Sequence, residues 1–184
     1  MNVRRRTQPA YPMIVALGVG ACVLALLSGC DKSKDDATPS ATLSSSVPTS
    51  FDPCHGIPAD VLAAQHLNAD PRPIPDNTGG PIDKYKGCDY TSQDAYQAER
   101  GPGITVRVTN VTMPYFVTNS QPQHQFQISG KDVATARAAG TNYCATLIAI
   151  HGGGIELSTS NSQADPCQVL VDLATGLAPT LPPN

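Results

Sequence analysis

Alternation of hydrophobic and polar positions is clearest between residues 103 and 111, where three aliphatic residues take turns with polar ones. This period of two is typical of a strand with one buried face. Residues 142–150 are apolar on both faces and predict a central strand. Residues 155–160 alternate again, and the segment 151–154, His-Gly-Gly-Gly, predicts the turn of a hairpin between them.

Two segments carry the spacing of amphipathic helices, 53–67 near the start of the domain and 166–178 near its end. Each begins within an Asp-Pro-Cys tripeptide, at 52–54 and at 165–167. Asp accepts hydrogen bonds from the free N–H groups of a first helical turn, and Pro fits the first helical position because no hydrogen bond is lost there. The tripeptide therefore predicts two helix starts, each with a cysteine in the first turn.

The remaining segments are shorter or more polar. Four prolines and a Gly-Gly pair predict a loop over 68–82. We expect a strand over 87–93 and short strands over 126–128 and 131–138, the last of which is alternatively a helical turn. Residues 112–125, which precede these two short strands, form a polar, Gln-rich connection.

The order of these elements, a helix, several strands and a final helix, predicts an α+β fold. We expect a single small domain in which an antiparallel sheet is covered on one face by the N- and C-terminal helices. Helices do not alternate with strands, which argues against a doubly wound parallel sheet. With 17 Pro, 15 Gly and only 5% aromatic residues, the core is modest and disulfides would help to stabilise it.

The start of the chain is interpreted as an export signal. Residues 1–6 carry three arginines and no acid, and an apolar run of 15 residues follows at 13–27, shorter than the roughly 20 residues of a membrane-spanning helix. The tetrapeptide Leu-Ser-Gly-Cys that ends at Cys30 matches the lipobox of bacterial lipoproteins, in which the cysteine thiol is acylated and the chain is cut before it. An ordinary signal peptide with a chance cysteine is the alternative.

Acylated Cys30 would hold the mature chain at the extracytoplasmic face of the cell membrane by lipid alone, since two or more acyl chains anchor stably. The predicted organisation is a signal peptide over 1–29, a flexible Ser/Thr/Pro tether over 30–50 and a disulfide-bonded domain over 51–184. Loss of the signal peptide removes three arginines and changes the formal charge from −3 to −6. This acidic balance argues against nucleic acid as a partner.

Four cysteines remain in the exported domain: Cys54, Cys88, Cys144 and Cys167. An even number in an exported domain predicts structural disulfides. A zinc site is the rival interpretation, but no pair has close CxxC spacing. Of the three possible connectivities we favour Cys54–Cys88 and Cys144–Cys167, because each joins a helix start to a nearby strand.

Several motifs occur in a characteristic order along the chain. They are the lipobox, the Ser/Thr tether, the Phe51-Asp-Pro-Cys54 opening, the Gly87-Cys88 strand, Cys144, the Asp165-Pro-Cys167 helix and the closing Leu181-Pro182. Together they resemble the actinobacterial lipoprotein family of the domain of unknown function three-five-five-eight, over nearly the whole mature chain. The resemblance implies an actinobacterial cell envelope and an α+β fold. It brings no activity, substrate or catalytic residue to carry over.

The sequence offers little catalytic chemistry. The His-Gly-Gly-Gly segment is similar to the oxyanion loop of some esterases, but the GxSxG pentapeptide that carries the nucleophile is absent. The four histidines, His55, His66, His124 and His151, are too widely spread to predict a metal site. We therefore predict no catalytic residue, no metal and no cofactor.

The best candidate for a recognition surface is the cluster of Met113, Tyr115 and Phe116 in the polar connection, because aromatic residues and Met are enriched at binding surfaces. The alternative is that these side chains fill the core or the edge of the sheet. The leading hypothesis is a non-enzymatic binding or accessory module that contacts an envelope protein or lipid. Carriage of a small apolar ligand or lipid is the alternative function, and an enzyme is the third.

Overall fold

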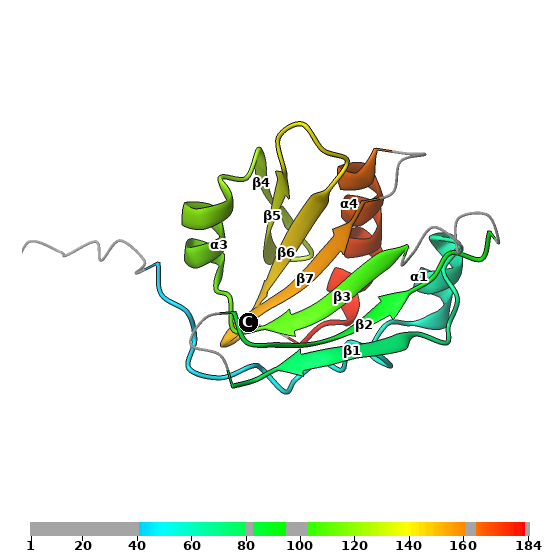
Figure 1. Cartoon of the computed structure of the whole chain (residues 1–184), viewed down its shortest axis with the longest axis horizontal. Helices are drawn as coiled ribbons and strands as arrows, with labels where there is room; N and C mark the ends of the chain where they lie inside the picture. The colour runs from blue at the N-terminus through cyan, green and yellow to red at the C-terminus, as the bar shows by residue number, and fades with distance from the viewer. Residues whose placement is uncertain (1–40, 80–82, 95–102, 161–164, 183–184) are drawn as a thin grey trace, which may run out of the picture. The chain divides into compact units, whose positions relative to one another are not determined.

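The computed structural model describes residues 41–79, 83–94, 103–160 and 165–182. Seven strands of this part form one antiparallel sheet in the order β1-β2-β3-β7-β6-β5-β4 (Figure 1). The strands are β1 (Arg72–Asn77), β2 (Tyr85–Tyr90), β3 (Ile104–Thr109), β4 (His124–Ile128), β5 (Lys131–Arg137), β6 (Cys144–Ile150) and β7 (Gly153–Thr159). The helices are α1 (Ala59–Ala64), α3 (Met113–Ser120), α4 (Pro166–Leu177) and the short 3-10 helix η1 (Ala178–Thr180). The predicted α+β class and antiparallel sheet are confirmed.

The first face of the sheet is packed against α4, which lies over β5, β6 and β7. Leu170, Leu173 and Leu177 on one side of α4 are completely buried. They share one core with aliphatic side chains of the strands, among them Ile148 and Leu157. The helical spacing of leucines over 166–178 therefore correctly predicted α4 and its buried side.

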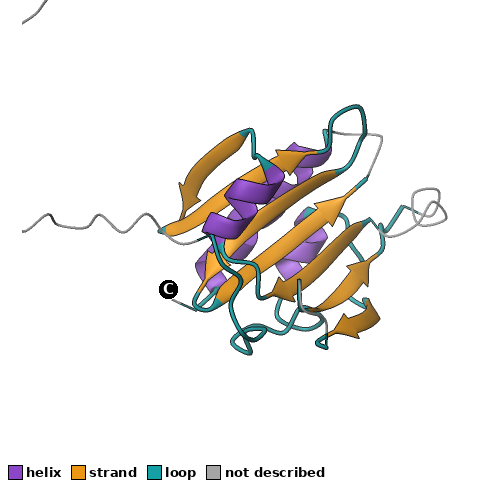
Figure 2. Ribbon diagram, turned by 60° about the vertical axis from the view of Figure 1, so that its left-hand side comes forward, coloured by secondary structure: helices purple, strands orange, loops and turns teal. Residues whose placement is uncertain are grey.

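The second face of the sheet is not bare, contrary to the expectation of helices on one face only. Figure 2 shows a helix on either side of the sheet, and the helix on the second face is α3, which packs on β5 and β6. Phe116 of α3 meets Ala134, Ala136 and Ala145 there. Small strand residues leave room for a helix to approach, and the aromatic ring fills that room.

The first predicted helix, 53–67, is mostly wrong. Asp52 does cap a turn, because its Oδ1 accepts from the Cys54 N–H at 2.8 Å and its carbonyl from the Gly56 N–H at 2.7 Å. The chain leaves that turn, however, and α1 occupies only Ala59–Ala64. Pro58 explains the break, since a proline disfavours helical backbone in the residue before it. The second Asp-Pro-Cys starts α4 as predicted.

The predicted loop over 68–82 is also wrong in part, because it contains β1. Two of its prolines, Pro73 and Pro75, lie within this strand. A proline lacks the N–H that a central strand needs, but an edge strand pairs on one side only and tolerates it. β1 is such an edge, next to β2 alone. Residues 131–137 form β5, so the strand rather than the helical turn was the correct alternative there.

Both predicted disulfides are present, with the favoured connectivity. Cys54–Cys88 joins the capped turn to β2, and Cys144–Cys167 joins β6 to the first turn of α4. In each bridge the Cα atoms lie 5.3 Å apart, within the ordinary range. Both bridges lie on the first face, where they fix the termini of the domain to the sheet.

Residues 41–50 of the predicted tether fall in the described part and lie along the domain. The Ser44 N–H donates to the Asn110 carbonyl at 2.9 Å, and the Asn110 side chain donates back to the Ser44 carbonyl at 2.9 Å. The Thr112 hydroxyl donates to the Thr42 carbonyl at 2.7 Å. Contacts with the folded domain therefore include residues 42 and 44, which lie within the segment predicted as a tether.

Candidate functional site

A pocket of about 350 Å³ opens between α3 and the second face of the sheet. Tyr115 and Phe116 of α3 line it on one side, and Ala145 of β6 lines it on the other. Polar groups reach the same space, among them Asn119 at the end of α3 and Glu156 of β7. An apolar wall with a few convergent polar groups is the usual character of a ligand-binding pocket.

Local capping features define both ends of helix α3. Thr112 is its N-cap, and the Thr112 Oγ1 accepts from the Tyr115 N–H at 3.4 Å. Pro114 lies in the first turn, where its missing N–H costs nothing. The helix ends at Gln121, whose backbone is left-handed with a φ of 47°. These caps make a rigid helix of eight residues in a segment whose polar composition predicted only a connection.

The structure places all three residues of the predicted recognition cluster on α3, but it separates them. Phe116 is 4% exposed and belongs to the core on the second face. Tyr115 is half-buried and lines the pocket. Met113 is half-buried and lines a second pocket, of about 370 Å³, with residues of β4 and β5 such as Gln125 and Asp132. The cluster is therefore partly core and partly pocket wall rather than one exposed surface.

Glu156 is paired with Arg107 of β3, its direct cross-strand neighbour. The Arg107 Nη1 lies 3.2 Å from the Glu156 Oε1, and the guanidinium stacks over the Tyr85 ring at 4.7 Å from its centroid. Burial raises the pKa of the Glu156 carboxyl above its usual range, although the positive charge of Arg107 acts in the opposite direction. A partly desolvated charge pair beside a pocket offers both a donor and an acceptor to a polar ligand.

The pairing of Arg107 with Glu156 was not predicted from the sequence. The only signal for it was a charged residue in the middle of each of two predicted strands, on the side away from the aliphatic residues. Whether two such residues meet depends on which strands are neighbours and in what register, and neither follows from local patterns.

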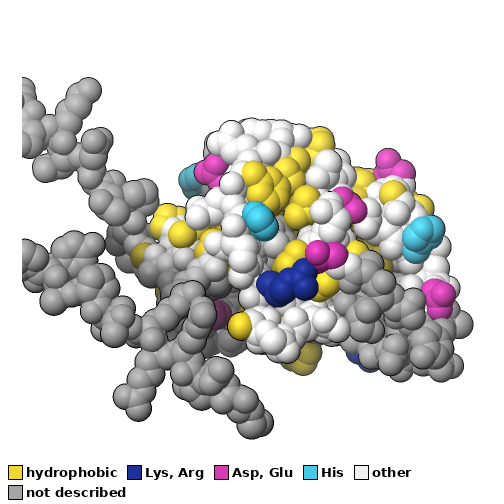
Figure 3. Space-filling model, turned by 90° about the horizontal axis from the view of Figure 1, so that it is seen from above, with side chains coloured by type: hydrophobic (Ala, Val, Ile, Leu, Met, Phe, Trp, Pro, Cys, Tyr) yellow, Lys and Arg dark blue, Asp and Glu magenta, His cyan; other side chains and the backbone are white. Residues whose placement is uncertain are grey.

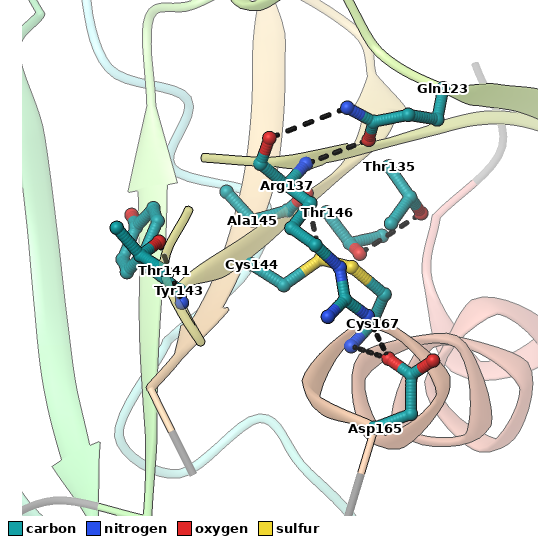
Figure 4. A network of polar contacts seen from close by, with 10 residues as sticks. All are labelled: Gln123, Thr135, Arg137, Thr141, Tyr143, Cys144, Ala145, Thr146, Asp165 and Cys167. Atoms are coloured by element: carbon teal, nitrogen blue, oxygen red, sulfur yellow. Dashed lines mark hydrogen bonds and ion pairs between the residues drawn. A yellow bond between two sulfur atoms is a disulfide. The ribbon is translucent and has the colours of Figure 1, made fainter. Parts of the chain in front are cut away.

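Arg137 at the end of β5 connects the pocket rim to the start of α4 (Figure 4). Its guanidinium forms an ion pair with Asp165, the N-cap of α4. The Asp165 Oδ1 also accepts from the Cys167 N–H at 3.0 Å, and this hydrogen bond is the main cause that lowers the pKa of Asp165. On the other side, the Gln123 Oε1 accepts from the Arg137 N–H at 2.7 Å. The rim is thus tied to the disulfide-bonded end of α4.

The model of the family described as "Protein of unknown function (DUF3558)" matches residues 25–180. The chain belongs to this family. No curated protein and no solved structure matches the chain.

The DUF3558 match includes the four disulfide cysteines, α3 and the residues around the pocket.

The His-Gly-Gly-Gly segment and His55, which were also candidates in the sequence, do not line this pocket. The His-Gly-Gly-Gly segment forms the predicted turn, and its third and fourth residues, Gly153 and Gly154, already belong to β7. A Cβ on Gly153 would lie 2.1 Å from the Thr109 carbonyl oxygen, so close packing explains that glycine. His55 contacts Asp52 at 3.0 Å and lies in an exposed turn.

Within the part of the chain that the structure describes, no group of three or more His, Cys, Asp or Glu side chains could hold a metal ion. Cys30 lies outside the described residues, and none of the helices within them is long and apolar enough to cross a membrane. On the face drawn in Figure 3, charged side chains stand singly or beside a charge of opposite sign, with apolar areas between them.

Proposed function

We propose that this DUF3558 protein is a lipid-anchored, non-enzymatic binding module at the extracytoplasmic face of the cell membrane, and that the pocket beside α3 is its binding site. The observation that carries the binding role is the pocket itself, with the apolar wall of Tyr115 and Phe116 next to the charge pair of Glu156 and Arg107. Such a site fits a partner that combines an apolar group with a hydrogen-bonding one.

The length of chain between Cys30 and Thr42 limits how far this site can lie from the proposed anchor. The carbonyl of Thr42 accepts a hydrogen bond from Thr112, the N-cap of α3. The twelve-residue distance in sequence from Cys30 to Thr42 spans at most about 40 Å when extended. Acylation of Cys30 would therefore keep α3 and its pocket within a short distance of the membrane surface.

Site-specific photo-crosslinking in intact cells tests the binding site. A photoreactive residue at Ser120, on the rim of the pocket, is expected to give a discrete crosslinked product. The matched control is Thr175, an exposed residue of α4 on the opposite side of the sheet. Absence of any product above the Thr175 control, with the protein present at the membrane, would count against the α3 pocket as a binding site.

A separate measurement tests the anchor. Replacement of Cys30 by serine is expected to move the protein from the detergent phase to the aqueous phase, since no acyl chain can then be attached. Unchanged partitioning would contradict lipid anchoring, and would leave the crosslinking result to be judged on its own.

Carriage of a small apolar ligand or lipid is the second candidate function, and the aromatic wall of the same pocket favours it. Native mass spectrometry of protein purified from its own host distinguishes the two. A retained ligand that is lost in the Tyr115→Ala variant favours carriage. An empty protein, together with a crosslinked protein partner at Ser120, favours the binding module.

A further inference from the structure

The two edges of the sheet differ in how they are protected. β1 carries Pro73 and Pro75, two charged residues and a break in its register with β2. β4 reads His-Gln-Phe-Gln-Ile and contains no proline and no acidic or basic residue other than His124. Exposed edge strands tend to pair with other strands unless proline, charge or irregularity prevents it. Among the described strands none lies beyond β4, which forms the outer border of the sheet in Figure 2.

The backbone groups that β4 presents outward follow from its turn. Ser129 and Gly130, with φ of 50° and 76°, form a two-residue turn that pairs Ile128 with Lys131. In such a hairpin the closing pair is hydrogen-bonded, and hydrogen-bonded and non-hydrogen-bonded pairs then alternate along the strands. Phe126 therefore directs its backbone groups to β5, whereas Gln125 and Gln127 direct their N–H and C=O groups away from the sheet.

From this arrangement we infer that β4 pairs antiparallel with β4 of a second copy of this chain, with Phe126 on the two-fold axis. In that register Gln125 of one copy lies opposite Gln127 of the other, and these are the residues whose backbone groups point outward, so each pair exchanges two hydrogen bonds. The two Phe126 residues form the non-hydrogen-bonded pair, in which side chains lie closest. The central Gln-Phe-Gln of the strand is symmetric about Phe126, so this register places like residues in equivalent positions.

The side chains of β4 suit a shared sheet. Phe126 and Ile128 are half-buried and pack against the core under α4. Across the axis, the exposed part of each Phe126 ring would meet its counterpart, and Ile128 would lie opposite His124 of the second copy. Aromatic and aliphatic cross-strand neighbours stabilise antiparallel pairs. Gln125 and Gln127 project from the other face, where uncharged amides do not repel each other.

The symmetry is also compatible with attachment to one membrane. A two-fold axis that joins two edge strands into one sheet runs perpendicular to that sheet, so both copies of α3 lie on the same side. Thr42 lies beside the start of α3, and therefore Thr42 of both copies also lies on that side. A five-residue strand buries less than the roughly 1,200 Å² of a stable interface. Pairing thus rests on the proposed lipid anchor for a high local concentration.

Cysteine crosslinking of the full chain in intact cells tests the pairing. Phe126→Cys places the new thiol opposite the same thiol of the second copy. We therefore expect a disulfide-linked dimer on gels that a reducing agent converts to monomer. Ile74→Cys, a half-buried residue of the opposite edge β1, is the matched control. Adding Gln125→Pro and Gln127→Pro should abolish the dimer, because these substitutions remove outward N–H groups and spare the bonds to β5. A dimer no stronger than the Ile74→Cys control, or one that survives both prolines, overturns the inference.

Native mass spectrometry of the unsubstituted chain, ejected directly from its membrane vesicles without detergent so that the local concentration is kept, decides the question if Phe126→Cys does not accumulate. A mass twice that of the monomer, lost in the Gln125→Pro, Gln127→Pro variant, supports β4 pairing, and a monomer or an unaffected dimer refutes it. Detergent partitioning of the same samples reports the anchor independently. An anchored monomer therefore refutes the pairing and leaves the proposed function intact.

Discussion

The two faces of the sheet are covered in different ways. On the first face, α4 packs three completely buried leucines against aliphatic strand residues, and both disulfides join this layer to the sheet. On the second face, a shorter helix covers only β5 and β6, meets alanines, and leaves a pocket beside a charge pair. The same strands supply both faces, because successive side chains point to opposite sides.

If the proposed function is correct, stability and recognition are divided between the two faces. Because the first face carries the close packing and both crosslinks, we expect it to supply most of the folding free energy. The second face can then tolerate an open pocket and a desolvated carboxylate, both of which lower stability. Substitutions on the first face should therefore unfold the domain, and substitutions on the second should change binding with little effect on folding.

Removal of the Cys144–Cys167 bridge should have the largest effect. The double variant Cys144→Ala, Cys167→Ala is expected to lose about 3 to 4 kcal/mol of unfolding free energy, because the unfolded chain regains the freedom of a closed loop. Denaturant unfolding measures this loss. A loss below about 1 kcal/mol would mean that packing alone holds α4 on the sheet, and the first face would owe little to its crosslink.

A matched pair of truncations compares the faces directly. Leu173→Ala is expected to cost about 3 kcal/mol, because it opens a cavity under α4. Tyr115→Ala removes a larger side chain but should cost about 1 kcal/mol or less, since the ring is half-exposed at the pocket. Thermal or denaturant unfolding gives both values. Equal costs would show that the second face is as tightly packed as the first.

Crosslinking from Ser120 extends this comparison to binding. Tyr115→Ala should abolish the crosslinked product although the domain stays folded, because the apolar wall of the pocket is lost. A product of unchanged intensity would place the partner elsewhere on the surface.

The differences between the faces also explain what the sequence could predict. The first face follows from local rules: Asp165 and Pro166 start α4, leucines at helical spacing give its buried side, and a cysteine in the first turn reaches the nearest strand. The disulfide connectivity was predictable for that reason. β1 was missed because Pro73 and Pro75 exclude a central strand but not an edge strand, and sequence alone does not say which strand will be an edge.

The second face depends on contacts between distant segments. α3 has only eight residues, and its hydrophobic residues follow one another over 113–117 instead of recurring at helical spacing, so its caps at Thr112 and Gln121 were the only local signal. The pairing of Arg107 with Glu156 requires the order and register of β3 and β7. The pocket lies between these elements, and therefore no local pattern could reveal it.

The N-cap of α3 offers a smaller test of the second face. Thr112→Ala should cost about 1 kcal/mol, because the Tyr115 N–H loses its acceptor and the Thr42 carbonyl loses its donor. Amide hydrogen exchange should become faster in α3 and stay unchanged in α4, since the faces are packed separately. Thr118→Ala is the control, because its hydroxyl donates within the helix to the Pro114 carbonyl and caps nothing. Faster exchange in both helices would mean that the two layers unfold as one unit.

The smallest expected effect is the pH dependence that Glu156 causes. Burial raises the pKa of Glu156 above its ordinary value of 4.5, so the folded chain holds this proton more tightly than the unfolded chain. The free energy of unfolding should therefore fall as the pH rises from about 4.5 through the pKa of the folded protein.

Glu156→Gln should remove this decline while keeping an acceptor for Arg107, and its unfolding free energy at pH 7 should lie within about 1 kcal/mol of the unsubstituted chain. Asp60→Asn, at an exposed position of α1, controls for the loss of one negative charge. If the free energy of unfolding declines with rising pH equally in both variants, the ion pair with Arg107 outweighs the burial of the Glu156 carboxylate. The charge of Glu156 then does not destabilise the second face. If only Glu156→Gln flattens the profile, the pocket keeps a carboxylate that folding alone does not favour, as expected of a residue retained for binding.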